Sequence, residues 1–296
     1  MMALVKGRDE WKTMLAWTGA GLGALVLSLL ATFPYDALHA RMMAELHRAT
    51  GLDVRVADWS VGVPLSVEWR QVTLSNPQID PIQVSFLQAK MGLLKALAGG
   101  LGVDVVIHLD ENSPNTGLAK GTMTASSLSL AGPVTLKGQL QQVDLSKLFR
   151  RYVTHGLLSG DFSHRLDSAS SGAGLLKGEG TWKADVKDVT VDHIPVGGGR
   201  TLALTFSRIS AAVTCRDAVC DVNEFKGDGI DGSFTAEGKI TLQQPVQQSQ
   251  LALTMTVIPG AGFTAKAGTL GLPPLPPGTP MTIKVQGTMA QARIAL

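Results

Sequence analysis

Residues 234–242 read Phe-Thr-Ala-Glu-Gly-Lys-Ile-Thr-Leu, so that apolar and polar side chains alternate along most of the segment. Successive side chains of a β-strand point to opposite faces of a sheet, and this period of two is typical of a strand with one apolar and one polar face. The same alternation recurs in residues 103–109, 182–186, 202–206, 251–257 and 281–285. Turn-forming residues separate the runs at intervals of about ten to fifteen residues, which favours antiparallel strands.

The composition is typical of a mainly β protein. The chain has 296 residues, of which 33 are glycine, and only 5% are aromatic and 17% charged. Apolar residues make up 45%, which argues against intrinsic disorder, and the formal net charge of +2 argues against a dedicated nucleic-acid binder. A mean hydropathy of +0.17, with one long apolar run, argues against a polytopic membrane protein.

The long apolar run covers residues 15–33, LAWTGAGLGALVLSLLATF, and contains no charge. As a helix it would span roughly 28 Å, close to the ~30 Å hydrocarbon core of a bilayer. Lys6, Arg8 and Lys12 precede it, so the positive-inside rule places residues 1–14 in the cytoplasm. The side chains predicted to anchor the chain are Leu15, Leu22, Leu25, Val26, Leu29, Leu30 and Phe33.

A cleaved signal peptide is the alternative interpretation of this run. Cleavage requires small residues at alternate positions just after the apolar segment. Neither residues 31–34 (ATFP) nor residues 37–40 (ALHA) fit that pattern. We therefore expect an uncleaved, single-pass anchor, with residues 34–296 forming one exported β domain.

Short helices are expected beside the strands, over residues 36–50, 91–98 and 144–152. In the first, Leu38, Met42 and Leu46 fall at helical spacing before Gly51. In the third, Asp144 is suited to cap the helix N-terminus. The proline-rich residues 273–277 predict a stiff extended connection.

The apolar faces of the strands must be covered, because a sheet with one apolar face otherwise leaves it in water. We expect an elongated, curved antiparallel sheet folded over this face, either as a rolled core or as a groove. Residues predicted to form the face are Val103, Val105, Ile107, Leu202, Leu204, Phe206, Phe234, Ile240, Leu242, Leu251, Leu253 and Met255.

The chain has two cysteines, Cys215 and Cys220, with Arg216-Asp217 as the expected turn between two strands. Such a turn can bring the two Cα atoms within disulfide range, about 5.5 Å. A metal site would need further ligands, and a redox pair is usually C-x-x-C. A structural disulfide is therefore the favoured interpretation over both alternatives, and it would persist in an oxidising compartment.

No motif predicts catalysis, a cofactor or a metal site. Ser163-His164 lies in a strand-like run without a nucleophile elbow, and the six histidines show no ligand spacing. Residues 197–200 (GGGR) lack the lysine and helix of a phosphate-binding loop. Asp228 and Asp231 lack the distant glutamate of a calcium loop, so a tight turn is favoured there. A periplasmic enzyme is the least favoured hypothesis.

The chain resembles the type II secretion system protein N family of the AsmA-like superfamily. The resemblance rests on the apolar helix and Pro34 followed by DALHARMMAELHRATG and LDVRVADWS, and on VPLSVEWRQVTLSNP. It extends to LSLAGPVTLKGQLQQVDLSKL and to the cysteine pair followed by FKGDGIDGSFTAEGKITL. Ser66 stands where glycine is usual in that family, and the proline-rich segment is a further departure.

The resemblance implies an inner-membrane accessory component of the type II protein secretion system in a Gram-negative cell. Its single-pass anchor would hold the C-terminal β domain in the periplasm, where it would act by protein–protein interaction with other membrane components of that system. The superfamily also includes proteins of lipid movement, so the alternative is a lipid-binding or lipid-transfer module whose groove holds acyl chains. Neither role implies an enzyme or a cofactor.

Overall fold

The computed structural model describes residues 17–18, 20–21, 28, 32, 34–50, 53–62, 66–76, 79–92, 95, 98–109, 116–127, 132–167, 178–197, 200–243, 248–269, 276–289 and 291–295. The chain divides into two compact units, Met1–Leu52 and Asp53–Leu296. Each unit is a separate body, and the second contains the whole β-sheet.

The first unit contains helix α2, Tyr35–Thr50, which confirms the helix predicted over residues 36–50. Asp36 lies in its first turn, where a carboxylate is favourable to the helix dipole. The predicted anchor side chains, from Leu15 to Phe33, all lie outside the described residues. Among the helices that are described, none is both long enough and apolar enough to span a bilayer.

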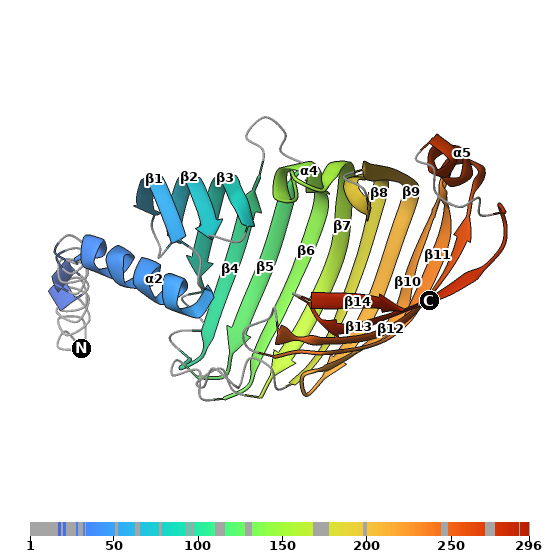
Figure 1. Cartoon of the computed structure of the whole chain (residues 1–296). Helices are drawn as coiled ribbons and strands as arrows, with labels where there is room; N and C mark the ends of the chain where they lie inside the picture. Colours follow the sequence, from blue (N-terminus) through green and yellow to red (C-terminus); the bar gives the residue numbers. More distant parts are fainter. Residues whose placement is uncertain are drawn as a thin grey trace, which may run out of the picture. The chain divides into compact units, whose positions relative to one another are not determined.

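The second unit is built on one antiparallel sheet of 14 strands, which confirms the mainly β prediction (Figure 1). The strands are β1 Asp53–Gly62, β2 Ser66–Asn76, β3 Ile79–Met91, β4 Leu101–His108, β5 Leu118–Ala125, β6 Val134–Asp144, β7 Val153–Leu166, β8 Gly178–Gly197, β9 Arg200–Arg216, β10 Val219–Gly229, β11 Gly232–Thr241, β12 Gln250–Pro259, β13 Met281–Thr288 and β14 Gln291–Ala295. The short helices α4, Leu145–Leu148, and α5, Ala261–Thr269, accompany them.

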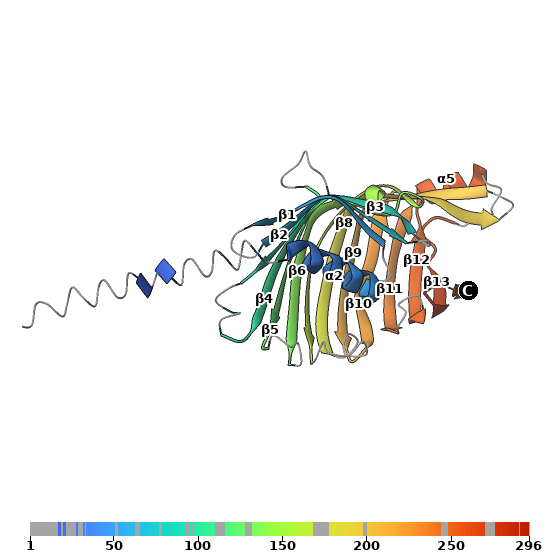
Figure 2. The ribbon, with the colours of Figure 1, turned by 90° about the vertical axis from the view of Figure 1, so that its left-hand side faces the viewer.

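Every strand pairs with the strands that precede and follow it in the chain, so the sheet is a continuous meander. As far as the chain is described, the sheet is open, and β1 and β14 are its edges. Figure 2 shows the strands arranged as a bent surface. Residues from β8 and from β13 line one cavity, so this part of the sheet curves over one of its faces.

One face of the sheet is apolar along its length. Directly paired residues of neighbouring strands put their side chains on the same side of the sheet, so each face can be followed from strand to strand through its paired residues. A row of paired residues without a charged side chain crosses the sheet from β1 to β13. The row consists of Val61, Val67, Ala89, Val105, Gly121, Gly138, Phe162, Trp182, Val213, Val222, Gly238, Leu253 and Val285.

The neighbouring row, one residue along each strand, faces the opposite side and is polar or small throughout. It consists of Gly62, Ser66, Lys90, Asp104, Thr122, Lys137, Ser163, Thr181, Thr214, Asp221, Lys239, Ala252 and Gln286. We call the two sides of the sheet the apolar face and the polar face. The strict alternation in sequence is therefore kept in register across the sheet.

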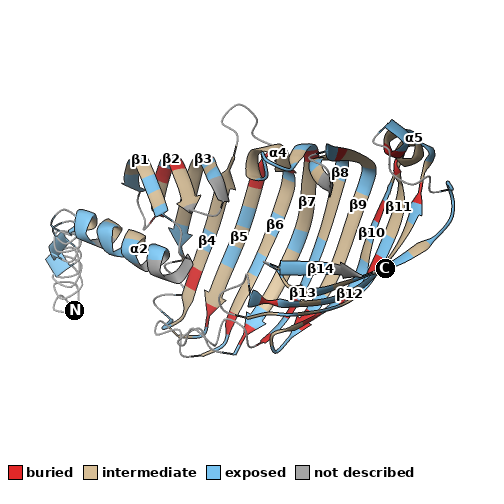
Figure 3. Cartoon of the chain, in the orientation of Figure 1, coloured by how far each residue is buried: buried red, intermediate tan, exposed pale blue. Residues whose placement is uncertain are grey.

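The apolar face is only partly buried. Fully buried positions are sparse and lie largely toward strand ends (Figure 3). One cluster of Ala125, Val134 and Leu166 packs with Met123 and Leu136 of β5 and β6. By contrast, Trp182 in the middle of the apolar row is 46% exposed and Val61 is 37% exposed. The described residues thus form a sheet with a thin core and an apolar face that is open over much of its length.

Several elements differ from the sequence prediction. The helix predicted over residues 144–152 is shorter than expected: α4 covers only Leu145–Leu148, with Asp144 as its N-cap, as predicted, whose carboxylate accepts from the Ser146 amide at 2.9 Å. Half of residues 91–98 lie outside the described residues; of the others, Met91 belongs to β3 and Lys95 is helical. The sequence prediction missed helix α5, which follows Pro259-Gly260 and has no apolar periodicity strong enough to mark it.

Candidate apolar binding groove

The curved part of the apolar face forms a half-open cavity of about 330 Å³. Strands β8 to β13 and helix α5 all contribute to its wall, which includes Leu204, Phe206, Phe225, Phe234, Met255 and Phe263. The volume lies at the lower end of the range of roughly 300–1,000 Å³ for small-molecule sites. With a wall so largely apolar, the cavity suits a hydrocarbon ligand.

Aromatic rings form part of the cavity wall. The ring of Phe234 makes edge contacts with Phe206 and Phe225, with centroids 5.3 and 5.1 Å apart. Phe234 also lies across Gly227 of the neighbouring strand, where a Cβ atom would overlap with the ring. Glycine therefore makes room for an aromatic ring, an arrangement that stabilises sheets.

The same arrangement occurs outside the cavity, further along the apolar row. Phe162 lies across Gly138 and stacks on Trp182, with ring centroids 4.8 Å apart. Trp182 is nearly half exposed, so this stacked pair forms an apolar surface that a ligand can contact. The aromatic wall of the cavity and the Phe162–Trp182 pair lie on one continuous face.

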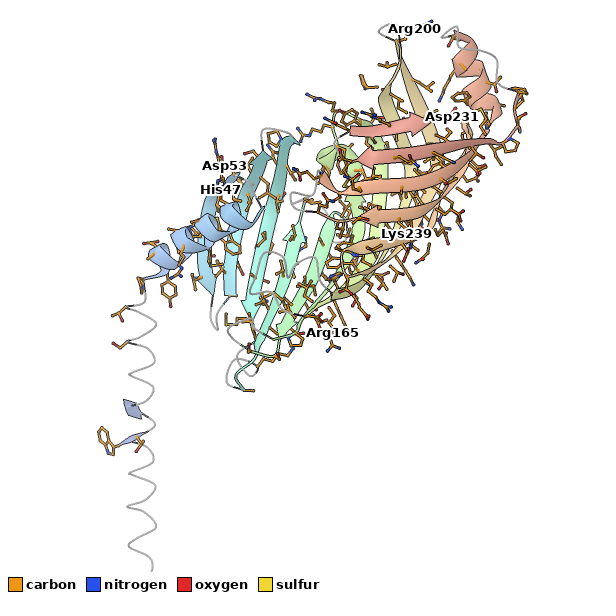
Figure 4. All side chains as sticks on the ribbon, turned by 60° about the horizontal axis from the view of Figure 1, so that its bottom comes forward. His47, Asp53, Arg165, Arg200, Asp231 and Lys239 are labelled. Atoms are coloured by element: carbon orange, nitrogen blue, oxygen red, sulfur yellow. A yellow bond between two sulfur atoms is a disulfide. The ribbon has the colours of Figure 1, made fainter. Side chains whose placement is uncertain are left out.

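Helix α5 is fixed beside the cavity by a buried carboxylate (Figure 4). Asp231, in the turn between β10 and β11, has a side chain that is fully buried. It accepts from Lys266 Nζ of α5 and from the Thr205 amide of β9, both at 2.6 Å. Lys266 Nζ also donates to the Ala203 carbonyl at 3.0 Å. These bonds join α5 to β9 and to the β10–β11 turn.

The backbone around Asp231 is closely packed as well. The Gly260 amide donates to the Asp231 carbonyl at 3.0 Å, and the Gly262 amide donates to the Ile230 carbonyl at 3.1 Å. A Cβ atom at Gly262 would approach Asp231 Oδ1 to 2.5 Å, so only glycine fits against the carboxylate without displacement. The start of α5 therefore sits directly on the turn, and Phe263 follows into the cavity wall.

His164 is the titratable group on the apolar face whose protonation the surroundings alter. Its ring is half-buried between Leu136 and Gly180, where a Cβ at Gly180 would overlap with the ring. Desolvation by burial lowers the pKa of the imidazole below its usual 6.5. The neutral ring is therefore the form that suits this apolar site.

This shift predicts a pH dependence of stability. The unfolded chain takes up a proton at His164 near the usual value of about 6.5, while the folded chain takes it up at lower pH. The free energy of unfolding should therefore fall as pH is lowered through this range. His164→Leu should lose less stability than the wild type between neutral and mildly acidic pH, measured by urea unfolding. His155→Leu, at an exposed position, is the control, and an equal slope in all three proteins would contradict the prediction.

Cys215 and Cys220 form a disulfide, with Cα atoms 3.9 Å apart. They are directly paired across β9 and β10 and are both buried. The turn lies at Asp217 and Ala218, one residue later than predicted, and both have positive φ. Two such residues are typical of the tight two-residue turn of a β-hairpin. The disulfide lies between Gly180 and Ile240 on the apolar face.

The structure distributes the predicted apolar residues along the sheet. Leu204, Phe206, Phe234 and Met255 meet in the cavity wall. Leu242 lies one residue beyond the end of β11. The others lie on strands away from the cavity wall, namely Val103, Val105 and Ile107 of β4, Leu202 of β9, Ile240 of β11, and Leu251 and Leu253 of β12.

Sequence reasoning missed the polar pair Asp231–Lys266 and the cavity residues Phe225 and Phe263. The available signal was the turn Gly229-Ile230-Asp231-Gly232, but nothing in it indicated a partner 35 residues away. Phe225 follows a bulge in β10, which interrupts the alternation that would have marked it.

The structure also shows where the weaker candidate residues lie. Ser163 belongs to the polar row, whereas His164 faces the apolar side, so the two side chains diverge. Asp228 is exposed while Asp231 is buried against Lys266. Among the side chains that are described, no three metal-ligating groups gather at one point.

No family model, curated protein or solved structure matches the chain.

Proposed function

We propose that the chain is a binding module that holds a lipid acyl chain on its apolar face. The observation that carries the proposal is the open apolar row, which crosses the sheet and leads into the cavity of β8–β13. Apolar side chains that packed only on one another would be fully buried, but Trp182 and Val61 remain over one third exposed. A long, flexible hydrocarbon chain matches a surface of this kind, because the hydrophobic effect is not directional.

A cavity-filling variant tests this proposal. Leu204→Trp/Met255→Trp places two indoles in the cavity wall and should displace the ligand. Native mass spectrometry of the full chain, released from lightly solubilised membranes, should show bound lipid for the wild type and at least a tenfold lower bound fraction for the variant. Each buried CH₂ group of an acyl chain contributes about 0.8 kcal/mol to binding, so a variant that excludes only a few of these groups from the cavity already loses tenfold in affinity.

The matched control is Thr201→Trp/Thr254→Trp, which adds the same two rings at exposed positions of the same strands. It should keep the wild-type amount of lipid, including any lipid that adheres to other parts of the chain. A wild-type protein that carries no lipid, or equal loss in both variants, would contradict the proposal.

We also propose a role in type II secretion, as an inner-membrane component with its β domain in the periplasm. It is supported by the resemblance described above and by the open sheet, whose edge strands β1 and β14 can each accept another strand. The AsmA-like character of the fold and the N-terminal anchor are part of this proposal. It is compatible with lipid binding, since the edges and the apolar face are different surfaces.

Crosslinking in cells tests the second role. A photo-reactive residue at Arg55 in β1 or at Gln291 in β14 should capture another secretion component, since both positions are exposed on edge strands. The same residue at Lys137, exposed on the polar face of central strand β6, is the control. Capture of no secretion component from either edge would contradict this role.

A further inference from the structure

Two exposed aromatic rings flank two exposed arginines in the turn between α4 and β7. We call residues 149–152, Phe149-Arg150-Arg151-Tyr152, the aromatic–arginine tip. Phe149 is 54% exposed and Tyr152 is 53% exposed, and both arginines are exposed. In Figure 1, α4 and α5 both lie at the upper ends of the strands. Apolar side chains that are exposed together on one part of a surface can mark an interaction site.

The backbone of the tip is held in one conformation. The Phe149 amide donates to the Leu145 carbonyl at 2.8 Å, and the Phe149 carbonyl accepts from the amides of Tyr152 and Val153 at 2.9 and 2.8 Å. The Tyr152 carbonyl accepts from the Asp192 amide of β8 at 2.7 Å. A partner would therefore meet a preformed turn and would not have to order it.

The charge at the tip is positive. Arg150 and Arg151 have no hydrogen bond or ion pair with any residue that the structure describes. Lys147 lies on the preceding turn of α4. The acidic residue that bonds to the backbone of the tip is Asp192, whose carboxylate accepts from the His193 amide at 2.7 Å and lies 3.8 Å from His193 Nδ1. The arginines are thus available to an external anion.

We propose that the aromatic–arginine tip docks on an anionic lipid surface. Aromatic rings partition into the boundary between headgroups and acyl chains, and arginines beside them reach the phosphates above it. This charge complementarity favours a membrane over a protein partner, for which four protruding side chains on one short turn offer no flat contact area. The inference does not rest on lipid in the cavity, because the tip acts whether or not the cavity is filled.

Vesicle binding by the full chain tests the inference. The chain is reconstituted in nanodiscs of phosphatidylcholine, which shield the apolar N-terminal run, and is mixed with vesicles of phosphatidylcholine alone or with added phosphatidylglycerol. The discs should co-sediment with the anionic vesicles only. Each basic residue near an anionic surface contributes roughly a fivefold factor in affinity, so Arg150→Gln/Arg151→Gln should weaken binding by about thirtyfold. Phe149→Ser/Tyr152→Ser should weaken it by at least tenfold.

The control variants remove the same kinds of side chain, two charged or two apolar, from other surfaces of the chain. Lys120→Gln/Lys183→Gln removes two exposed charges from strands β5 and β8, and Ile258→Ser/Met289→Ser removes two exposed apolar side chains. Both should bind as the wild type does. Circular dichroism of each variant establishes that the sheet is folded before binding is measured.

Hydrogen exchange adds a readout at the site itself. The peptide covering residues 148–155 should exchange more slowly when anionic lipid is present, either in the disc or in added vesicles. Absence of protection with anionic lipid, equal binding to neutral vesicles, or unchanged binding of the tip variants would each overturn the inference. Protection of the peptide by a captured protein, with none by lipid, would overturn it in favour of a protein partner.

Discussion

Asp231→Ala should lower the free energy of unfolding by about 3 kcal/mol. The substitution leaves the half-buried Thr205 amide without its acceptor and removes the carboxylate that pairs with Lys266. The lysine side chain is 36% exposed and can return to water, which keeps the loss at the low end for a broken buried ion pair. Urea unfolding followed by circular dichroism measures the change.

The same variant should release helix α5 before the sheet unfolds. Hydrogen exchange of residues 261–269 should become faster than in the wild type, since the substitution removes one of the two hydrogen bonds by which Lys266 holds α5 to the sheet. Asp228→Ala removes an exposed carboxylate three residues earlier and should change stability by no more than about 0.5 kcal/mol. Equal losses in the two variants would show that Asp231 does not fix α5.

Gly160→Ala should destabilise the sheet by about 2 kcal/mol. Gly160 of β7 lies opposite Ala184 of β8, and an added Cβ would lie 3.2 Å from the Ala184 Cα atom and overlap with the Lys183 carbonyl oxygen. These are backbone atoms, so the two strands would have to separate for the methyl group to fit. Thermal and urea unfolding report the loss.

Gly121→Ala is the matched control, because it makes the same change on the same face of another strand. Its Cβ would lie 3.6 Å from the Lys137 carbonyl oxygen, which is an ordinary contact. Replacing glycine by alanine there should be neutral or slightly stabilising, because glycine weakens strands. A loss at Gly121 as large as at Gly160 would mean that the backbone approach between β7 and β8 is not the cause.

The strands were predictable where alternation is regular. In β12 and β13 the apolar residues fall at every second position, and both strands form as expected. The hairpin that joins Cys215 and Cys220 was predictable for the same reason, together with the turn between them. Strand β3 was not identified, because Pro81 and the mixed sequence that follows it hide the period.

The cavity could be predicted only in part, since alternation shows which face is apolar but not where the sheet curves. Phe234 and Met255 come together with Leu204 because the bend between β8 and β13 turns distant strands toward one another. The contacts of Asp231 depend on the same bend and on α5. Curvature of this kind is set by bulges and by the glycines that allow strands to approach, and their effect is not local in the sequence.

Because each strand pairs only with its neighbours in the chain, the sheet has the energetics of a repeat array, in which stability is close to a sum over adjacent pairs. The loop that must close to form any pair is short, so contact order is low for an all-β protein, and assembly can start at one hairpin and spread in both directions. Such an array can gain or lose a hairpin at either end with little effect on the middle. The length of the apolar face can therefore change during evolution by the addition or removal of hairpins.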